Sequence, residues 1–258
     1  MTKIYAIVNQ KGGVGKTTSV INISAFLAAN GRRVLMVDMD PQANATSGLG
    51  YNKYEMEPST YELLLETSSL SDVVIPSIEF SLDILPAHPA LSGAEVELVN
   101  AIGREYRLQQ ALAQVNGRYD YILIDCPPSL SLLTVNALTA ARDGVLIPVQ
   151  CEYLALEGLS QLTQTIELVQ KYLNPDLKIR GLLMTMYDSR TNLSRQVVEE
   201  VRKFFPDKVF RTIIPRNIRL SEAPSFGQPI NVYAPSSPGG IAYKVLTAEL
   251  VKGDQGKG

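Results

Sequence analysis

Residues 9–18, NQKGGVGKTT, have the types and spacing needed to bind phosphate groups. The ordinary phosphate-binding loop has the pattern G-x-x-x-x-G-K-[ST], in which backbone N–H groups surround phosphate oxygens. Residues 15–17 supply the G-K-T end, but Gln10 stands where the first glycine belongs, and a second lysine, Lys11, follows it. The stretch therefore predicts a nucleotide site with one additional positive charge.

Each part of this loop has a predicted role in holding a nucleotide. Its glycines allow backbone conformations that other residues avoid, so that N–H groups can approach phosphate oxygens. The Lys16 ammonium is expected to reach the β and γ phosphates, the Thr17 hydroxyl to bind Mg²⁺, and the Thr18 hydroxyl to donate to the α phosphate. The predicted nucleotide-binding residues of the loop are Gly12, Gly13, Val14, Gly15, Lys16, Thr17 and Thr18.

Acidic residues end two other apolar stretches and could serve the same site. Asp125 ends YDYILID and is expected to hold Mg²⁺ through water. In RVLMVDMD, Asp38 and Asp40 end a similar stretch, and open α/β sheets gather their ligands at such strand ends. Asp40 is predicted to position or deprotonate an attacking water and to reach Mg²⁺ through water. A purely structural role for Asp40 is the alternative.

The elements that must position these residues are apolar runs alternating with helical patterns. Runs rich in Val, Ile and Leu on both faces indicate strands buried on both sides, which is typical of parallel sheets. Strands are predicted at residues 4–9, 33–40, 82–87, 119–127, 144–150 and 179–186, and helices at residues 17–30 and 156–173.

This alternation predicts right-handed βαβ units and a fold of the α/β class. We expect a single domain over residues 1–252 with a doubly wound, mostly parallel sheet flanked by helices. A frayed tail is expected over residues 253–258, GDQGKG. The loop NQKGGVGKTT then joins the first strand to the first helix, which is the placement that a phosphate-binding loop requires.

Composition and charge narrow the function further. The 258 residues are 45% hydrophobic and 19% charged, which is ordinary for a globular protein. No apolar run reaches the roughly 18 residues of a membrane span, and Cys126 and Cys151 lack metal-type spacing. The net charge is −2, yet residues 178–219 contain ten Lys or Arg and only four acids. That basic stretch indicates either a surface that binds a polyanion or a merely solvated face.

Several motifs together resemble those of one protein family. KGGVGKTT resembles the deviant Walker A motif, VDMDPQ the A′ motif and IDCPP the Walker B motif. CEYLALEGLSQL, TNLSRQVVEEV and IPRNIRLSEAPSFGQPI are similar to segments of the ParA/Soj chromosome-partitioning ATPases, and the resemblance runs from Lys3 to about Tyr243. It implies an ATPase with Mg²⁺ and slow basal turnover, which forms a homodimer with ATP and binds double-stranded DNA without sequence preference. It also implies reset by a ParB-type activator protein, and a cytoplasmic protein that associates with the nucleoid when ATP is bound.

The resemblance also implies roles for individual residues. The lysine that matches Lys11 crosses the interface of an ATP-sandwich dimer and contacts the phosphates of the other subunit's nucleotide. A side chain in place of Gly12 would block that close approach. Lys11, Lys16 and Asp40 are therefore the predicted catalytic residues. Pro215 and Asn217 are expected to line the adenine pocket, and Arg190 and Arg219 to bind DNA.

Three other interpretations of the same loop remain open. A MinD-like membrane ATPase needs a basic amphipathic C-terminal helix, which IAYKVLTAELVKGDQGKG does not resemble, so we expect no membrane binding. A nitrogenase-type iron protein needs cysteines shared across a dimer, and Cys126 beside the Walker B acid does not match that pattern. A ParA relative that positions another cargo, such as a plasmid, is not distinguished by the sequence.

Overall fold

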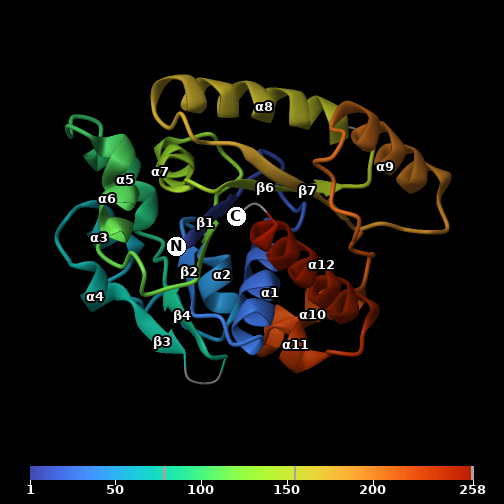
Figure 1. Ribbon diagram of the computed structural model, residues 1–258. Coiled ribbons are helices and arrows are strands. Elements are labelled where there is room, and N and C mark those ends of the chain that lie inside the picture. Colours follow the sequence, from blue (N-terminus) through green and yellow to red (C-terminus); the bar gives the residue numbers. More distant parts are fainter. Residues whose placement is uncertain (78–79, 154, 257–258) are drawn as a thin grey trace.

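In a computed structural model that describes residues 1–77, 80–153 and 155–256, the described strands form one seven-stranded sheet (Figure 1). The strands lie in the order β3-β4-β2-β5-β1-β6-β7. Every neighbouring pair is parallel except β3 with β4, which confirms the predicted doubly wound, mostly parallel α/β fold. The strands are β1 (Lys3–Ile7), β2 (Val34–Asp38), β3 (Ile75–Ser77), β4 (Leu82–Leu85), β5 (Tyr121–Asp125), β6 (Gly144–Gln150) and β7 (Ile179–Thr185).

The edge strand β3 has no counterpart among the predicted strands. It has only three residues, and the middle one, Pro76, is exposed. Proline cannot donate a ladder hydrogen bond and is tolerated mainly at sheet edges, which is where β3 lies. A segment this short offers no apolar run from which it could be predicted.

Helices cover both faces of the sheet (Figure 1). One face carries α1 (Lys16–Ala29), α2 (Asn44–Gly48), α10 (Ile218–Glu222), α11 (Ile230–Tyr233) and α12 (Pro238–Gln255). The other core contains residues of α3 (Thr60–Leu64), α4 (Leu70–Val73), α5 (Leu91–Glu97), α6 (Arg107–Ala113), α7 (Leu132–Ala140), α8 (Ala155–Tyr172) and α9 (Asn192–Phe204). Short 3₁₀ turns lie at η1 (Arg104–Tyr106) and η2 (Ala223–Phe226). Among the described residues, no helix combines the length and apolar character needed to cross a membrane.

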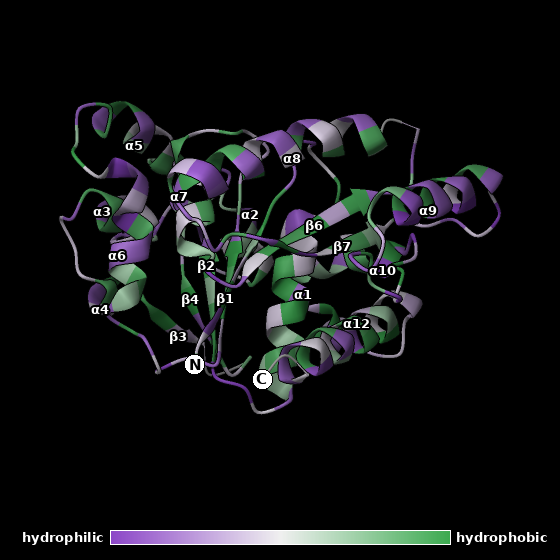
Figure 2. Cartoon of the chain, turned by 45° about the horizontal axis from the view of Figure 1, so that its top comes forward, coloured by the Kyte–Doolittle hydropathy of each residue, from purple (hydrophilic) through white to green (hydrophobic). Residues whose placement is uncertain are grey.

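The central strands bury side chains on both faces, as their continuous apolar composition predicts. In β1, Ile4 and Ala6 belong to one core, whereas Tyr5 and Ile7 belong to the core beneath α1 and α12. Figure 2 shows the strands as mostly hydrophobic, while α8 and α9 alternate between hydrophobic and hydrophilic residues. Because β1 is central, the loop that follows it is held by a rigid, doubly covered strand.

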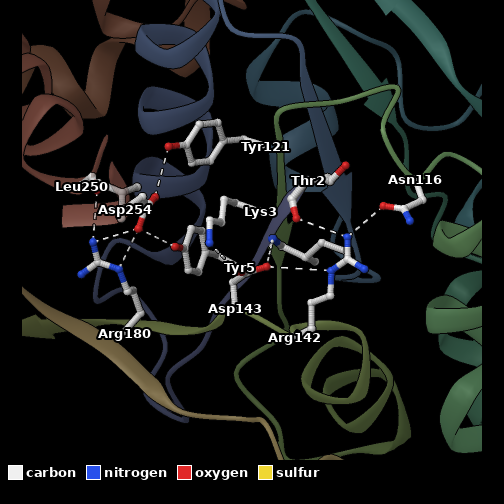
Figure 3. A network of polar contacts seen from close by, with 11 residues as sticks. Thr2, Lys3, Tyr5, Asn116, Tyr121, Arg142, Asp143, Arg180, Leu250 and Asp254 are labelled. Carbon is white, nitrogen blue, oxygen red and sulfur yellow. Dashed lines mark hydrogen bonds and ion pairs between the residues drawn. The ribbon is translucent and has the colours of Figure 1, made fainter. Parts of the chain in front are cut away.

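The end of the chain differs from the predicted frayed tail. Helix α12 continues to Gln255, and the side chain of Asp254 is only 6% exposed. Asp254 accepts hydrogen bonds from Tyr5 Oη (2.7 Å) and Tyr121 Oη (3.1 Å) and forms an ion pair with Arg180 (3.0 Å; Figure 3). The expectation is therefore wrong for residues 253–255, because contacts with three strands fix this acid. Residues 257–258 lie outside the described residues.

Candidate nucleotide-binding site

The glycine-rich loop connects β1 to α1 at the carboxyl edge of the sheet. Gly13 (φ 73°) and Gly15 (φ 91°) have left-handed backbone conformations, which side chains disfavour. Gly15 is the N-cap of α1 and makes no side-chain capping bond, so the first N–H groups of this helix remain for a ligand. The local sequence thus produces an anion-binding helix start, as the motif predicts.

Two adjoining cavities open beside this loop. The first has a volume of about 550 Å³, and the second has a volume of about 440 Å³. Gly15, Thr18, Met186 and Pro224 line both cavities. The predicted residues Gly12, Gly13, Gly15, Lys16, Thr17, Thr18 and Asp40 line the first cavity, and Pro215 and Asn217 line the second.

Lys16 places a buried ammonium group beside the loop. The residue is 7% exposed, and its Nζ donates to the carbonyl oxygen of Lys11 at 3.1 Å. Burial lowers the pKa of Lys16, and the negative charge of Asp125 opposes that shift. A phosphate ligand would stabilise this buried cation further, because charges interact strongly away from water. Val14, in the same loop, is buried, and its carbonyl oxygen accepts a hydrogen bond from Thr185 Oγ1 at 2.9 Å.

Asp125 lies at the end of β5, next to the start of α1. Its Oδ2 accepts a hydrogen bond from Thr17 Oγ1 at 2.7 Å, whereas its buried Oδ1 has no partner among the described residues. Burial raises the pKa of Asp125 well above its usual range, and the nearby charge of Asp38 raises it further. An unsatisfied buried carboxylate oxygen is costly, and this one fits a cation or its bound water.

Asp38 and Asp40 have different surroundings. Asp38 is fully buried and accepts hydrogen bonds from Thr46 N (2.9 Å), Thr46 Oγ1 (2.8 Å) and Asp40 N (3.1 Å). Asp40 lines the first cavity, and its Oδ1 accepts from Gln42 N at 2.9 Å. Asp38 therefore orders the backbone that presents Asp40. The D-x-D spacing is the only sequence signal for this role, and it does not by itself assign the role to Asp38.

The side chain of Lys11 points away from the cavity that Lys16 lines, although the Lys11 carbonyl oxygen accepts a hydrogen bond from Lys16 Nζ. The Lys11 side chain is 43% exposed and forms an ion pair with Glu152, which follows β6. The described residues that line the two cavities do not include Lys11. The structure thus places Lys16 inside the subunit's own cavity and Lys11 outside it.

The two arginines predicted to bind DNA lie on segments next to the second cavity. Arg190 is 83% exposed and follows β7, and Arg219 is 53% exposed and is the second residue of α10. An isolated parallel β-bridge between Tyr187 and Pro215 holds the two segments side by side. Asn217 caps α10, because its Oδ1 accepts from Arg219 N at 3.2 Å.

Met186 is a cavity residue that no sequence pattern indicated. It follows β7, lines both cavities, and has a left-handed backbone conformation (φ 52°). Strained backbone of this kind in a non-glycine residue is concentrated at binding and catalytic sites. The TMYD stretch of residues 185–188 gives no sign of it, since the strain arises where β7 meets the following loop.

Comparisons with known proteins agree with this geometry. A family model described as an AAA domain matches residues 2–179. The sporulation initiation inhibitor protein Soj of Bacillus subtilis is 58% identical over 250 residues, covering 97% of this chain and 98% of that protein. The chromosome partitioning protein ParA of Myxococcus xanthus is 57% identical over 255 residues, covering 99% and 90%. A crystal structure of cobyrinic acid a,c-diamide synthase from Mycobacterium smegmatis, with bound ATP analogue and magnesium, is 41% identical with a TM-score of 0.88, covering 100% and 98%.

Proposed function

The chain belongs to the ParA/Soj family of chromosome-partitioning ATPases and uses ATP with Mg²⁺, and on that premise we propose how its residues act. ATP occupies the two adjoining cavities, with its phosphates in the first and its adenine in the second, beside Pro215 and Asn217. The observation that carries this proposal is the buried Lys16 ammonium, next to a helix start with open N–H groups.

The residues that would hold Mg²⁺ are Thr17 directly, and Asp125 and Asp40 through water. The buried Oδ1 of Asp125, which has no partner among the described residues, supports this set, because an oxygen of that kind accepts a hydrogen bond from metal-bound water. When bound, Mg²⁺ offsets the negative charge of the β and γ phosphates. Asp40 orients the attacking water and takes its proton.

Lys11 completes the site of a second subunit. Two nucleotides facing each other bring several negative charges together, and one lysine from each subunit offsets that repulsion. The exposed position of Lys11, outside its own cavity, supports a role in trans. Gly12 is also exposed, and a Cβ there would meet no atom of the same chain within 4 Å. A Cβ at Gly12 thus causes no clash within its own chain, which supports an effect on the approach of a partner subunit.

The ATP-bound dimer binds DNA without reading its bases, and a ParB-type activator stimulates hydrolysis and releases it. We propose that the cargo is the chromosome. Two relatives that are 58% and 57% identical span nearly the whole chain, and they are named Soj and chromosome partitioning protein ParA. Amide transfer, which the name of the Mycobacterium smegmatis protein suggests, is less well supported. Both cysteines are buried, and burial raises the pKa of Cys151 to about 12, so neither suits a thiolate nucleophile.

DNA binding should depend on Arg190 and Arg219 in the ATP-bound dimer. We expect Arg190→Glu or Arg219→Glu to abolish or strongly weaken binding to unrelated duplexes, because phosphate contacts carry no sequence information. In the milder Ala variants, the slope of the logarithm of the binding constant against the logarithm of the salt concentration should become shallower by roughly 0.9 for each phosphate that is no longer neutralised. Gel shifts over a salt series measure both effects.

Arg33→Glu is the matched control for these charge reversals. Arg33 is also exposed and paired with a carboxylate, but it precedes β2 and thus lies at the amino ends of the parallel strands, opposite to the carboxyl ends that carry the nucleotide-binding loop. ATP-driven dimerisation should survive in all three variants, as gel filtration would show. Unchanged DNA binding by both Arg190→Glu and Arg219→Glu would mean that the basic stretch is only a solvated face.

A further inference from the structure

Each arginine expected to bind DNA is already engaged by a carboxylate of its own chain. Arg190 donates from Nε to Asp188 Oδ1 (2.9 Å) and from Nη2 to Asp188 Oδ2 (2.7 Å), which is a two-pronged pair. Arg219 donates from Nη1 to Glu222 Oε2 at 2.8 Å. The two side chains that must reach DNA phosphates are therefore not free cations in the isolated chain.

Both carboxylates are held in place by other groups as well. Asp188 Oδ1 accepts a hydrogen bond from the backbone N of Arg190 at 3.0 Å, and Glu222 Oε2 accepts from Tyr233 Oη at 3.0 Å. The guanidinium of Arg190 lowers the pKa of Asp188 to about 2, so this acid is charged at neutral pH. The two acids are therefore anchored beside the arginines in the isolated chain.

These ion pairs reduce the net electrostatic attraction between a DNA phosphate and each arginine. A phosphate must share or replace a carboxylate that already neutralises the arginine, so one contact brings little net attraction. Exposed ion pairs of this kind are weak, however, so they yield when several phosphates compete at once. Since counterion release adds up over contacts, doubling the number of arginines raises affinity steeply.

Resting on the proposed DNA binding, we propose that Asp188 and Glu222 are counter-charges that keep the DNA affinity of a single subunit low, so that useful binding requires the dimer. They act as masks on Arg190 and Arg219. The masked arginines lie on the two segments that line the second cavity and are joined at Tyr187 and Pro215. Both pairs therefore belong to one structural unit beside the nucleotide.

The test neutralises the masks without removing their other hydrogen bonds. Asp188→Asn keeps an oxygen for the backbone N of Arg190, and Glu222→Gln keeps one for Tyr233. The full chain, each single variant and the double variant are titrated against two unrelated fluorescent DNA duplexes. The titrations are made over a salt series, with ATP and Mg²⁺ and without nucleotide.

The matched control is Asp120→Asn. Asp120 pairs with exposed Arg33 in nearly the same way, accepting from its Nη2 at 2.9 Å and from its backbone N at 2.9 Å. This variant changes the net charge by the same amount as each single mask variant. Asp120 immediately precedes β5, however, and so lies at the amino ends of the parallel strands, away from the carboxyl ends where the nucleotide-binding loop lies. A mere increase in net charge would affect this variant equally.

With both masks neutralised, the double variant should bind DNA at least about ten-fold more tightly with ATP. The slope of the logarithm of its binding constant against the logarithm of the salt concentration should become steeper by roughly 0.9 for each additional phosphate that is neutralised. It should also bind measurably without nucleotide, while Asp120→Asn behaves like the parent. Affinity that stays unchanged or falls in the double variant, or that rises in Asp120→Asn as much as in a single mask variant, would overturn the proposal. If the parent itself fails to bind DNA with ATP, the proposed DNA binding is rejected, and the proposal that Asp188 and Glu222 limit it is rejected as well.

Discussion

Lys16→Ala is expected to abolish ATP binding, whereas Lys11→Ala is expected to retain ATP binding and to lose both dimerisation and hydrolysis. The difference follows from placement. Lys16 is buried and lines the first cavity, so its loss removes the charge that the phosphates of the same subunit need. Lys11 is exposed and pairs with Glu152, so its loss leaves the subunit's own cavity intact.

Isothermal titration calorimetry with a slowly hydrolysed ATP analogue separates the two variants, and gel filtration with ATP and Mg²⁺ reports the dimer. Gly12→Val is a second variant that tests the same proposed interface as Lys11→Ala. It should also bind nucleotide as a monomer, because a Cβ at this position has no atom of its own chain within 4 Å and would instead obstruct the partner subunit. If calorimetry found Lys11→Ala as unable to bind as Lys16→Ala, the role of Lys11 in trans would be wrong.

Asp40→Ala is expected to lower ATP turnover by a factor on the order of 10²–10⁴, which is the usual contribution of a general base. The ATP dimer should persist and remain on DNA, because Asp40 is not expected to hold the two subunits together. Asp40→Asn provides a second variant, since it keeps an oxygen that can accept from Gln42 N while removing the charge.

Turnover is followed by phosphate release, and the dimer by gel filtration with ATP and Mg²⁺. Both variants should be slow and dimeric. A monomer in the presence of ATP for Asp40→Ala would reject the catalytic assignment and leave Asp40 as a structural acid. A fast, dimeric Asp40→Asn would show that the charge of Asp40 is not needed to activate the water.

The parts of the fold that depend on local pattern could be predicted from the sequence. Continuous apolar runs indicated the parallel strands, and the G-K-T end of the loop indicated where α1 starts, because both signals arise from neighbouring residues. The acids that end β2 and β5 were expected at one edge, and the strand register sets Asp38 directly opposite Asp125. Parallel strands bring their ends together whatever the rest of the chain does.

Features that depend on distant contacts were not predictable in the same way. Asp254 belongs to a glycine-rich end that looks disordered, yet Arg180, more than seventy residues earlier, orders it. The pairing of Arg219 with Glu222 was equally hidden, because a charge count does not show which acids neutralise which bases. Local composition therefore predicted the basic stretch but not that its key arginines are already paired.

The claim that Lys11 acts on the nucleotide of the other subunit is tested most directly by mixing two inactive variants, Lys11→Ala and Asp40→Ala. Asp40 lines the same cavity as Lys16 of its own chain, so it should act within its own subunit. In a mixed dimer, the Lys11→Ala subunit keeps its Asp40 and receives Lys11 from its partner, which makes one complete site. We predict that mixing restores ATP hydrolysis in proportion to the mixed dimers that form, because each of them holds one complete site. A mixture as inactive as either variant alone, although mixed dimers form, would contradict the account.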